Sequence, residues 1–271
     1  MLIELTSLIA SIAFALTGSL SFWKVHYWYD FYIPIILFIS GYIFMIFIFW
    51  WWLLAAFGLF VNQNKVYERQ DKWSKFWFKE GLHYINKHAR IKVKIKNIDK
   101  LPNSNFLLIC NHRSKFDPMI IGDIFNNKEI AFITKSSNFK IPLGHKFMTG
   151  LCYMGVNRDD KIQSLGVMKR STALLKGGQV SIGCFPEGKR NVNETLLPFH
   201  EGIFSVALAS KVPIVIMTIK NTENIHHNFP FKKTNVELNI LGVMEYEEYM
   251  DNTPVSISNN IHQLMLNDLS K

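Results

Sequence analysis

The first part of the chain is a long apolar region. Residues 31–64 contain no charged residue and are longer than the about 20 apolar residues that cross the hydrocarbon core of a bilayer. Residues 5–23 are also uncharged, although serines and threonines interrupt them. We therefore predict that residues 1–64 form two helices that insert into a membrane as a hairpin, joined by a polar turn at residues 24–30.

A basic and aromatic junction follows. Residues 65–90 mix lysines and arginines with tryptophan, phenylalanine and tyrosine. Such a mixture is typical of a helix lying on a membrane surface. It is equally typical of an amphipathic helix packed on the domain that follows. The pattern leaves both interpretations open.

The pattern changes again from residue 91 onward. Short apolar runs rich in Ile, Val and Phe alternate with stretches of helical composition, which is typical of an α/β fold. We predict that residues 91–271 form one domain, a mixed and largely parallel sheet flanked by helices. The predicted strands are 91–98, 105–110, 129–133, 151–156, 179–185, 213–219 and 235–241. The predicted helices are 118–125, 160–175, 204–211 and 256–269.

Charge separates the apolar front end from the rest. The 271 residues carry a formal net charge of +9, while residues 1–63 sum to −1, so the remainder carries +10. A basic body suits an anionic partner: nucleic acid, an acidic carrier protein, phosphate groups or an anionic leaflet. The lysines that follow the second apolar run favour a body on the cytoplasmic side of the membrane.

Cysteine and histidine usage indicates no metal and no cofactor. Cys110, Cys152 and Cys184 are odd in number, widely separated and flanked by apolar residues, which favours reduced core thiols. The histidines at 200, 226 and 227 lack metal-ligand spacing. No Gly-rich nucleotide loop is present. The aromatic residues concentrate near the front end, away from any nucleic-acid motif, so we expect no nucleic-acid partner.

The most informative segment runs from Asn111 to Pro118, directly after a predicted strand. It contains His112 and, five positions later, Asp117. A carboxylate on one ring nitrogen of histidine fixes the tautomer and stabilises imidazolium, so the other nitrogen can accept a proton near neutral pH. We therefore predict that His112 is a general base and Asp117 its partner. This spacing alone is weak, because it also arises by chance.

Two further polar segments follow apolar strands. Phe185-Pro-Glu-Gly-Lys-Arg190 combines a turn with an arginine, and Gly155-Val-Asn-Arg158 supplies a second arginine. Each guanidinium has the planar fork that suits phosphate or carboxylate. Taken alone, each arginine is more typical of a solvated surface charge, and it is the presence of the other loops that favours a phosphate site. We expect the segments to share one edge of the sheet with His112.

In their order along the chain, these segments resemble the motifs of the glycerolipid acyltransferases, specifically the bacterial 1-acylglycerol-3-phosphate acyltransferases. The Asn111-His112-x4-Asp117 block resembles their first motif. Lys135 with Pro142, Gly144 and residues 155–158 resembles the second, residues 185–190 the third and residues 212–215 the fourth. The resemblance covers roughly residues 101–221, and the ordered set is far more specific than any one member.

The resemblance implies a reaction and its participants. His112 would deprotonate the sn-2 hydroxyl of 1-acylglycerol-3-phosphate as it attacks an acyl thioester, held by acyl carrier protein or coenzyme A, to give phosphatidate. The substrate-binding residues that it implies are Arg158, Glu187, Gly188, Arg190 and Lys135. It also implies membrane lipids as partners and a place on the cytoplasmic side of a bacterial inner membrane.

Two departures from the family pattern concern the acceptor. Lys189 stands where the third motif commonly has Thr, and Asn157 stands where the second commonly has Asp. Both changes make the site more positive. These departures leave open the same chemistry on another lysophospholipid. A second alternative, which rests on the basic body, is a non-catalytic, membrane-anchored basic module.

Overall fold

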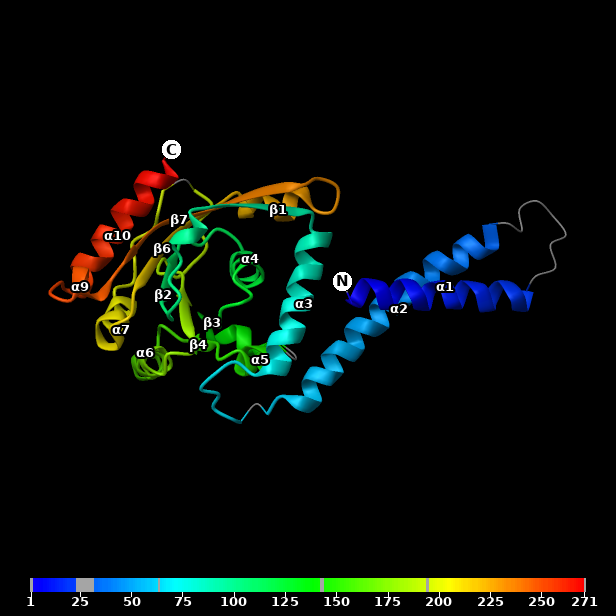
Figure 1. Ribbon diagram of the computed structural model, residues 1–271, viewed down its shortest axis with the longest axis horizontal. Coiled ribbons are helices and arrows are strands. Elements are labelled where there is room, and N and C mark those ends of the chain that lie inside the picture. The colour runs from blue at the N-terminus through cyan, green and yellow to red at the C-terminus, as the bar shows by residue number, and fades with distance from the viewer. Residues whose placement is uncertain (1, 23–31, 63, 142–143, 194, 271) are drawn as a thin grey trace. The chain divides into compact units, whose positions relative to one another are not determined.

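The computed structural model describes residues 2–22, 32–62, 64–141, 144–193 and 195–270. The chain divides into two compact units, Met1–Val61 and Asn62–Lys271, and each is described by itself. The larger unit contains the sheet, and its elements are labelled in Figure 1.

A seven-stranded sheet forms the centre of the larger unit. Its order is β1-β7-β6-β2-β5-β3-β4, and only the β6–β7 pair is antiparallel. The predicted fold class of the body, a mixed and largely parallel sheet flanked by helices, is confirmed. The strands are β1 (Ile91–Lys96), β2 (Leu107–Cys110), β3 (Ile130–Lys135), β4 (Met154–Val156), β5 (Ser181–Cys184), β6 (Ile214–Lys220) and β7 (Thr234–Met244).

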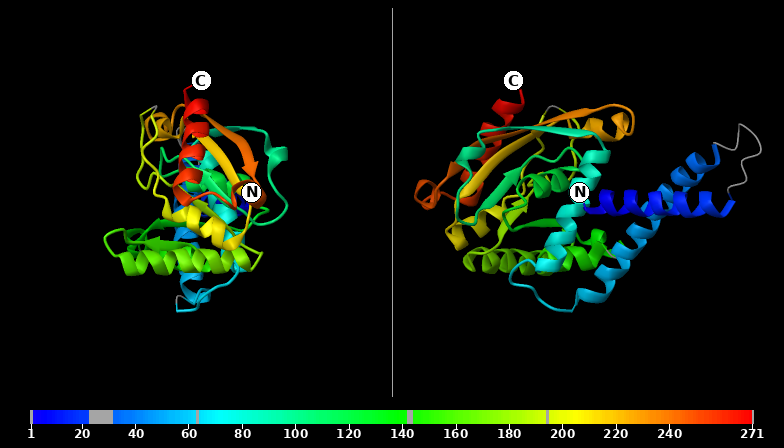
Figure 2. Two further views of the ribbon diagram at one scale, coloured as in Figure 1. Left: turned by 90° about the vertical axis from the view of Figure 1, so that its left-hand side faces the viewer. Right: turned by 45° about the vertical axis from the view of Figure 1, so that its right-hand side comes forward.

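Helices cover both faces of the sheet. Figures 1 and 2 show α3 and α4 on one side and α6, α7 and α10 on the other. The α4 side chains Ile120 and Ile121 pack into a core cluster with strand residues such as Leu108 and Met217. The helices of the body are α3 (Lys72–His88), α4 (Asp117–Ile124), α5 (Gly144–Gly150), α6 (Lys161–Lys176), α7 (Gly202–Ser210), α8 (Ile225–Asn228), α9 (Tyr246–Tyr249) and α10 (Pro254–Leu269).

Parallel strands have a direct consequence for the position of a site. β2, β3, β4, β5 and β6 all run in the same direction, so the loops that follow them leave from one edge of the sheet. In open α/β sheets this carboxyl edge is where ligands commonly bind. β7 runs against β6 and therefore begins at the same edge.

The predicted strand at 151–156 is shorter than expected. β4 spans only Met154–Val156, because α5 ends at Gly150 and the chain turns at Cys152, whose φ is 61°. The backbone N–H of Tyr153 donates to the carbonyl of Met148 at 2.7 Å and closes this turn. The apolar run of 151–154 therefore serves the turn as well as the strand.

α3 accounts for the basic and aromatic junction. Asp71 caps it by accepting the backbone N–H of Ser74 at 2.8 Å. Trp77 and Leu82 are buried, and the helix contacts α4 and β1. These contacts favour the interpretation of an amphipathic helix packed on the domain.

The smaller unit consists of two helices, α1 (Leu2–Phe22) and α2 (Tyr32–Phe60), which contact each other. The ring of Phe14 occupies the space that a side chain at Gly41 would need, so this glycine allows close approach. Two helices were predicted in residues 1–64, and this part is confirmed. The predicted polar turn at 24–30 lies outside the described residues.

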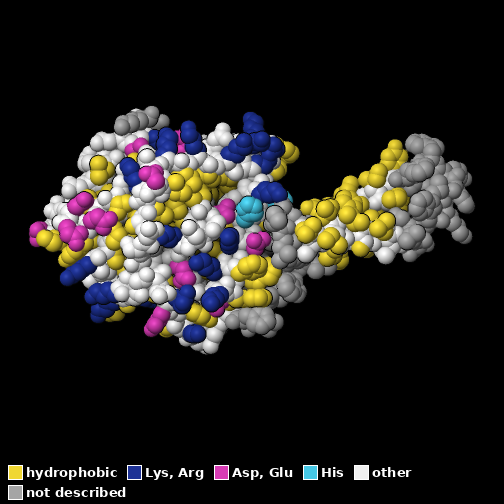
Figure 3. Space-filling view, viewed as in Figure 1, with side chains coloured by type: hydrophobic (Ala, Val, Ile, Leu, Met, Phe, Trp, Pro, Cys, Tyr) yellow, Lys and Arg dark blue, Asp and Glu magenta, His cyan; other side chains and the backbone are white. Residues whose placement is uncertain are grey.

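The membrane part of that prediction is not supported by the structure. Within the described part of the chain, no helix combines the length and the apolar character needed to cross a bilayer. The helices nevertheless expose large apolar side chains, among them Leu16 (59 %), Ile36 (62 %) and Phe47 (62 %). Figure 3 shows these as yellow side chains over much of this unit.

Candidate active site

Asn111 fixes the chain where β2 ends. Its side-chain amide donates to the carbonyl of Ile219 at 3.0 Å, and its side-chain oxygen accepts the backbone N–H of Ile219 at 2.8 Å. Asn111 is buried. The pair of bonds extends the β2–β6 pairing by one residue through a side chain. The next residue, His112, therefore leaves the sheet in a defined direction.

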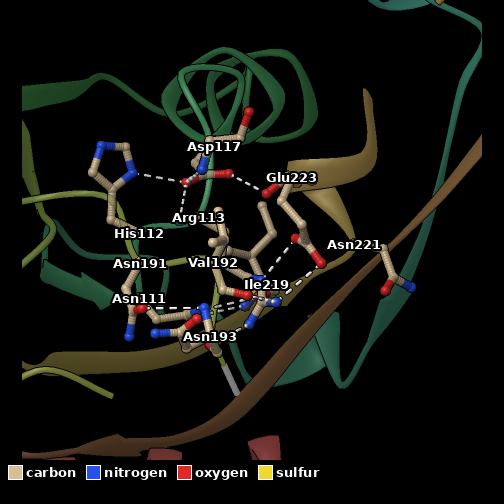
Figure 4. A network of polar contacts seen from close by, with 12 residues as sticks. Asn111, His112, Arg113, Asp117, Asn191, Val192, Asn193, Ile219, Asn221 and Glu223 are labelled. Carbon is tan, nitrogen blue, oxygen red and sulfur yellow. Dashed lines mark hydrogen bonds and ion pairs between the residues drawn. The ribbon is translucent and has the colours of Figure 1, made fainter. Parts of the chain in front are cut away.

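His112 and Asp117 form a direct pair, as predicted from their spacing. Nδ1 of His112 lies 2.7 Å from Oδ2 of Asp117. The carboxylate is fully buried, whereas the imidazole is about 20 % exposed. Because a carboxylate only accepts, Nδ1 carries the proton and Nε2 keeps its lone pair. Figure 4 shows the second ring nitrogen pointing away from Asp117.

Asp117 is held by four donors. Its Oδ2 also accepts the backbone N–H groups of Arg113 at 2.7 Å and Ser114 at 2.8 Å. Its Oδ1 accepts the hydroxyl of Thr222 at 2.5 Å. Asp117 is also the first residue of α4, where the helix dipole favours negative charge. The four donors thus hold the carboxylate in a fixed position beside the imidazole.

Thr222 is a member of the site that sequence reasoning missed. It is fully buried and follows β6, the strand adjacent to β2. The signal that could have found it is a hydroxyl residue in the polar segment that follows the predicted strand 213–219, at the edge where the other polar segments gather. Its hydroxyl is the only side-chain donor besides His112 among the four that reach Asp117.

An aromatic wall supports the imidazole. The His112 ring stacks on Phe185 with centroids 4.4 Å apart and an interplanar angle of 24°. Phe185 stacks in turn on Phe132 at 5.7 Å and 9°. These contacts restrict rotation of the ring about its side-chain bonds. Through this stacking, Phe185 links the segment of residues 185–190 to the segment of residues 111–118.

Glu187 lies beneath the site. The side chain is buried, and its two oxygens accept the backbone N–H of His112 at 2.8 Å and of Leu197 at 3.0 Å. Burial raises the pKa of Glu187, and the hydrogen bonds from the two backbone N–H groups oppose that rise. The backbone N–H of Asn191 also donates to the carbonyl of His112 at 2.7 Å. The loop after β5 is therefore tied to the residue that carries the imidazole.

Arg158 and Gly188 bring the second and third segments together. The guanidinium of Arg158 donates to the carbonyl of Gly188. Gly188 has a φ of 71°, and the guanidinium occupies the space where a β-carbon would stand. Only glycine meets both conditions without strain. The sequence prediction that these segments share one edge is confirmed.

The remaining predicted residues are peripheral to this network. Arg190 is exposed in the loop that contains Gly188, and Lys135 is exposed at the end of β3. Neither joins the hydrogen bonds that the described residues form around His112. Pro142, quoted for the second motif, lies outside the described residues. Both charged side chains are at the same sheet edge as His112, where they can meet an anion.

Arg113 forms a second polar network that the sequence did not indicate. Its Nε and Nη2 bind the two carboxylate oxygens of Glu223 at 2.7 and 3.0 Å. Its guanidinium also donates to the carbonyls of Val192 and Asn193. Figure 4 shows this fork between the loop after β5 and the segment after β6. Four of its five N–H groups are engaged in these bonds, so Arg113 orders the loop.

The thiols near the site are unsuited to covalent catalysis. Burial raises the pKa of Cys110 well above its usual range, and burial raises the pKa of Cys184 to about 12. Both therefore remain protonated near neutral pH, and the thiolate is the reactive form. The three cysteines are free. Among the described residues, no group of three His, Cys, Asp or Glu side chains could hold a metal ion.

Taken together, the edge carries an imidazole paired with a buried carboxylate and, in adjoining loops, two arginines. The imidazole has a free nitrogen, a fixed tautomer and a buried counter-charge. The arginines come from two adjoining loops. Such an arrangement can remove a proton from a hydroxyl whose molecule also carries an anionic group.

Known proteins resemble this chain in sequence over the same region. Residues 92–220 match the family model described as Acyltransferase. Three similar relatives are 1-acyl-sn-glycerol-3-phosphate acyltransferases. The protein of Saccharomyces cerevisiae is 26 % identical over 53 % of this chain and 48 % of its own length. That of Escherichia coli is 27 % identical over 48 % and 52 %, and a chloroplastic protein of Arabidopsis thaliana 31 % over 49 % and 37 %.

The chain spans about half the length of the curated relatives it matches. A solved structure extends the likeness of the fold. The crystal structure of a 1-acyl-sn-glycerophosphate acyltransferase from Thermotoga maritima aligns with a TM-score of 0.58 and 19 % identity, over 82 % of this chain and 88 % of that one. At this identity the likeness concerns the fold alone.

Proposed function

We propose, from the match of residues 92–220 to the Acyltransferase family model, that the protein transfers a fatty acyl chain to the sn-2 hydroxyl of 1-acylglycerol-3-phosphate. The product is phosphatidate. The observation that carries the proposal is the pairing of His112 with the buried Asp117 at the sheet edge that also holds Arg158. The names of the relatives supply the reaction class.

The proposed step needs no protein nucleophile. Nε2 of His112 takes the proton of the acceptor hydroxyl while the oxygen attacks the carbonyl carbon of an acyl thioester. Asp117 stabilises the imidazolium that forms. The tetrahedral intermediate then collapses, the carbon–sulfur bond breaks, and the imidazolium returns its proton to the departing thiolate. One ester bond forms, one thioester bond breaks, and His112 ends as it began.

The acceptor headgroup is the proposed ligand of the basic loops. Its phosphate would meet Arg158 and Arg190, with Lys135 and Lys189 adding positive charge at the same edge. Gly188 is proposed to act through Arg158, whose guanidinium it admits. Glu187 is proposed as a positioning residue, because its carboxylate is engaged with two backbone N–H groups. Holding hydroxyl and thioester in one orientation supplies a large part of the rate.

Gly188→Ala is expected to raise KM for the phosphate acceptor by roughly tenfold while kcat changes less, because the new methyl group displaces the Arg158 guanidinium. Gly178→Ala is the matched control, since Gly178 has a similar φ of 74° but open space around its β-carbon position. It carries the same backbone strain without touching an arginine. Steady-state kinetics over a range of acceptor concentrations measure both variants. Equal KM values in the two would contradict the role given to Arg158.

We propose that the donor is an acyl thioester of acyl carrier protein or coenzyme A. The net charge of +10 on residues 64–271 suits either, because both carriers are anionic. The chain itself favours neither carrier.

We further propose that the protein works at a membrane, on the cytoplasmic side of a bacterial inner membrane. Support comes from the apolar side chains that α1 and α2 expose, such as Ile9 (58 %) and Ile43 (63 %). Surfaces of this kind are unfavourable in water and suit contact with lipid. Lysines in residues 65–79 favour the cytoplasmic side. The acceptor is an amphiphile that resides in the same place.

The test is acylation by the purified full chain in detergent or lipid vesicles. Lysophosphatidate with a labelled acyl thioester should give phosphatidate at a rate well above that with lysophosphatidylcholine. If another lysophospholipid were acylated and lysophosphatidate were not, the proposed acceptor would be wrong and the proposed reaction class would stand. The absence of transfer to any lysolipid, with either donor, would overturn the enzymatic assignment.

A further inference from the structure

A second surface of the body combines exposed aromatic side chains with lysines. Between α8 and β7, the side chains of Phe229 and Phe231 are 54 % and 84 % exposed. Lys232 and Lys233 follow and are also exposed. We call residues 229–233 the Phe-Lys loop. Two large aromatic side chains this exposed, only two positions apart, make the loop a candidate for contact with another molecule.

The Phe-Lys loop is held in place by its backbone. The N–H of Phe229 donates to the carbonyl of Ile225 at 2.9 Å, and the N–H of Lys232 donates to that of Asn228 at 2.7 Å. The guanidinium of Arg90 donates to the carbonyl of Phe231 at 2.8 Å. The phenylalanines are therefore presented to solvent by an anchored loop. The exposure of the two phenylalanines is therefore set by the backbone hydrogen bonds that hold the loop.

The start of β1 adds positive charge beside this loop. Ile91 pairs with Thr234, so β1 begins next to the end of the Phe-Lys loop. Residues 81–98 and 224–236 contain no Asp or Glu. Exposed basic residues of these two segments are Lys87, Arg90, Lys92, Lys94, Lys232 and Lys233, whereas Lys96 farther along β1 forms an ion pair with Glu237 at 3.4 Å. Figure 3 shows dark blue side chains gathered beside yellow ones over this part of the body.

This surface lies at the edge of the sheet that carries the candidate active site. β7 is antiparallel to β6 and begins where β6 ends. The segment that joins these strands first supplies Thr222 to Asp117 and Glu223 to Arg113, and then continues through α8 into the Phe-Lys loop. A molecule bound to the loop is thus bound at the same end of the body as His112.

We propose that the Phe-Lys loop and the start of β1 form a membrane-docking surface, which inserts Phe229 and Phe231 between the headgroups of an anionic leaflet while the lysines bind the headgroups. The lysines alone would suit an acidic protein as well as they suit an anionic leaflet. The phenylalanines favour lipid, because a mixed surface of aromatic and basic side chains is typical of proteins that lie in the interface. This docking delivers the amphiphilic acceptor to the edge that carries His112, a step that rests on the proposed function.

A fluorescent probe at position 231 tests the docking directly. The full chain carries Cys184→Ala with either Phe231→Cys or, as a control, Val255→Cys, labelled with an environment-sensitive dye. Val255 is 45 % exposed and opens α10, which follows the far end of β7. With phosphatidylglycerol vesicles, the dye at 231 should gain intensity and be quenched by a nitroxide lipid, whereas the dye at 255 should not respond. High salt or Lys232→Glu with Lys233→Glu should abolish the response.

Kinetics separate this inference from the proposed function. Lys232→Gln with Lys233→Gln should raise KM for acceptor presented in anionic vesicles by roughly fivefold per lysine, and leave turnover of a short-chain, monomeric acceptor unchanged. Loss of turnover with both the vesicle-bound and the monomeric acceptor would point to misfolding of the lysine variant. The probe at position 231 avoids this difficulty, because Lys232 and Lys233 are unchanged in that protein. The inference is overturned if the dye at 231 ignores vesicles to which the protein is bound, or responds to an acidic carrier protein alone.

Discussion

His112→Ala is expected to lower kcat/KM for acyl transfer by about 10³- to 10⁴-fold, the largest loss of any single substitution in this chain. Among the described residues of the site, His112 supplies the nitrogen that combines a free lone pair with a buried counter-charge, since its Nδ1 is engaged by Asp117. KM for the acceptor should change little, because the basic loops remain. Initial rates with a labelled thioester donor measure the loss.

His83→Ala is the matched control for that experiment. Nδ1 of His83 lies 4.0 Å from Oδ1 of Asp123, so it is a second histidine with a carboxylate neighbour, and its side chain is 57 % exposed on α3. Its replacement should leave the rate within about twofold of that of the unsubstituted protein, as for most surface substitutions. A comparable loss in both variants would mean that general disturbance, rather than loss of a base, lowers the activity.

Asp117→Asn is expected to lower kcat/KM by roughly 10²- to 10³-fold, somewhat less than His112→Ala. The amide oxygen can still accept the imidazole and the N–H groups of Arg113 and Ser114, while the amide nitrogen can donate to the Thr222 hydroxyl. The hydrogen-bonded geometry is therefore kept and only the negative charge is lost. What disappears is the stabilisation of imidazolium in the transition state.

Asp117→Ala shows why the amide is the cleaner substitution. It leaves two backbone N–H groups and the Thr222 hydroxyl without their buried acceptor, and each unsatisfied group costs about 1–3 kcal/mol. We expect a much lower melting temperature for the alanine variant than for the asparagine variant. Asp123→Asn serves as the control, since Asp123 is 19 % exposed and its amide can still accept the hydrogen bond of Asn86. Full activity in a folded Asp117→Asn protein would remove the carboxylate from the mechanism.

The sequence predicted the elements of the body because its apolar runs are short and well separated. All seven predicted strands exist, and His112 and Asp117 form the pair that their spacing, the further polar segments and the family resemblance together predicted. Spacing succeeds here because both residues lie on one strand-to-helix connection, so their distance in space depends on five residues of local geometry. The meeting of Arg158 with Gly188 followed from a second rule, that parallel strands end at one edge.

The parts that escaped prediction depend on contacts between distant segments. Thr222 lies 105 residues from Asp117, and Glu223 lies 110 residues from Arg113. The sequence around Thr222 and Glu223 does not show which partners they meet, because it is the β2–β6 pairing that brings them near Asp117 and Arg113. The environment of Glu187 was hidden for the same reason: an acidic residue in a polar turn resembles a surface group, yet it is buried beneath His112.

The most direct measurement of the central claim compares a hydroxyl acceptor with its thiol analogue. A lysophosphatidate whose sn-2 oxygen is replaced by sulfur ionises with a pKa near that of a free thiol, about 8.5, so its attack needs far less help from a base. If His112 removes the acceptor proton, His112→Ala should lose about 10³-fold or more with the hydroxyl and less than about tenfold with the thiol. Equal losses with both acceptors would contradict the role of His112 as the general base.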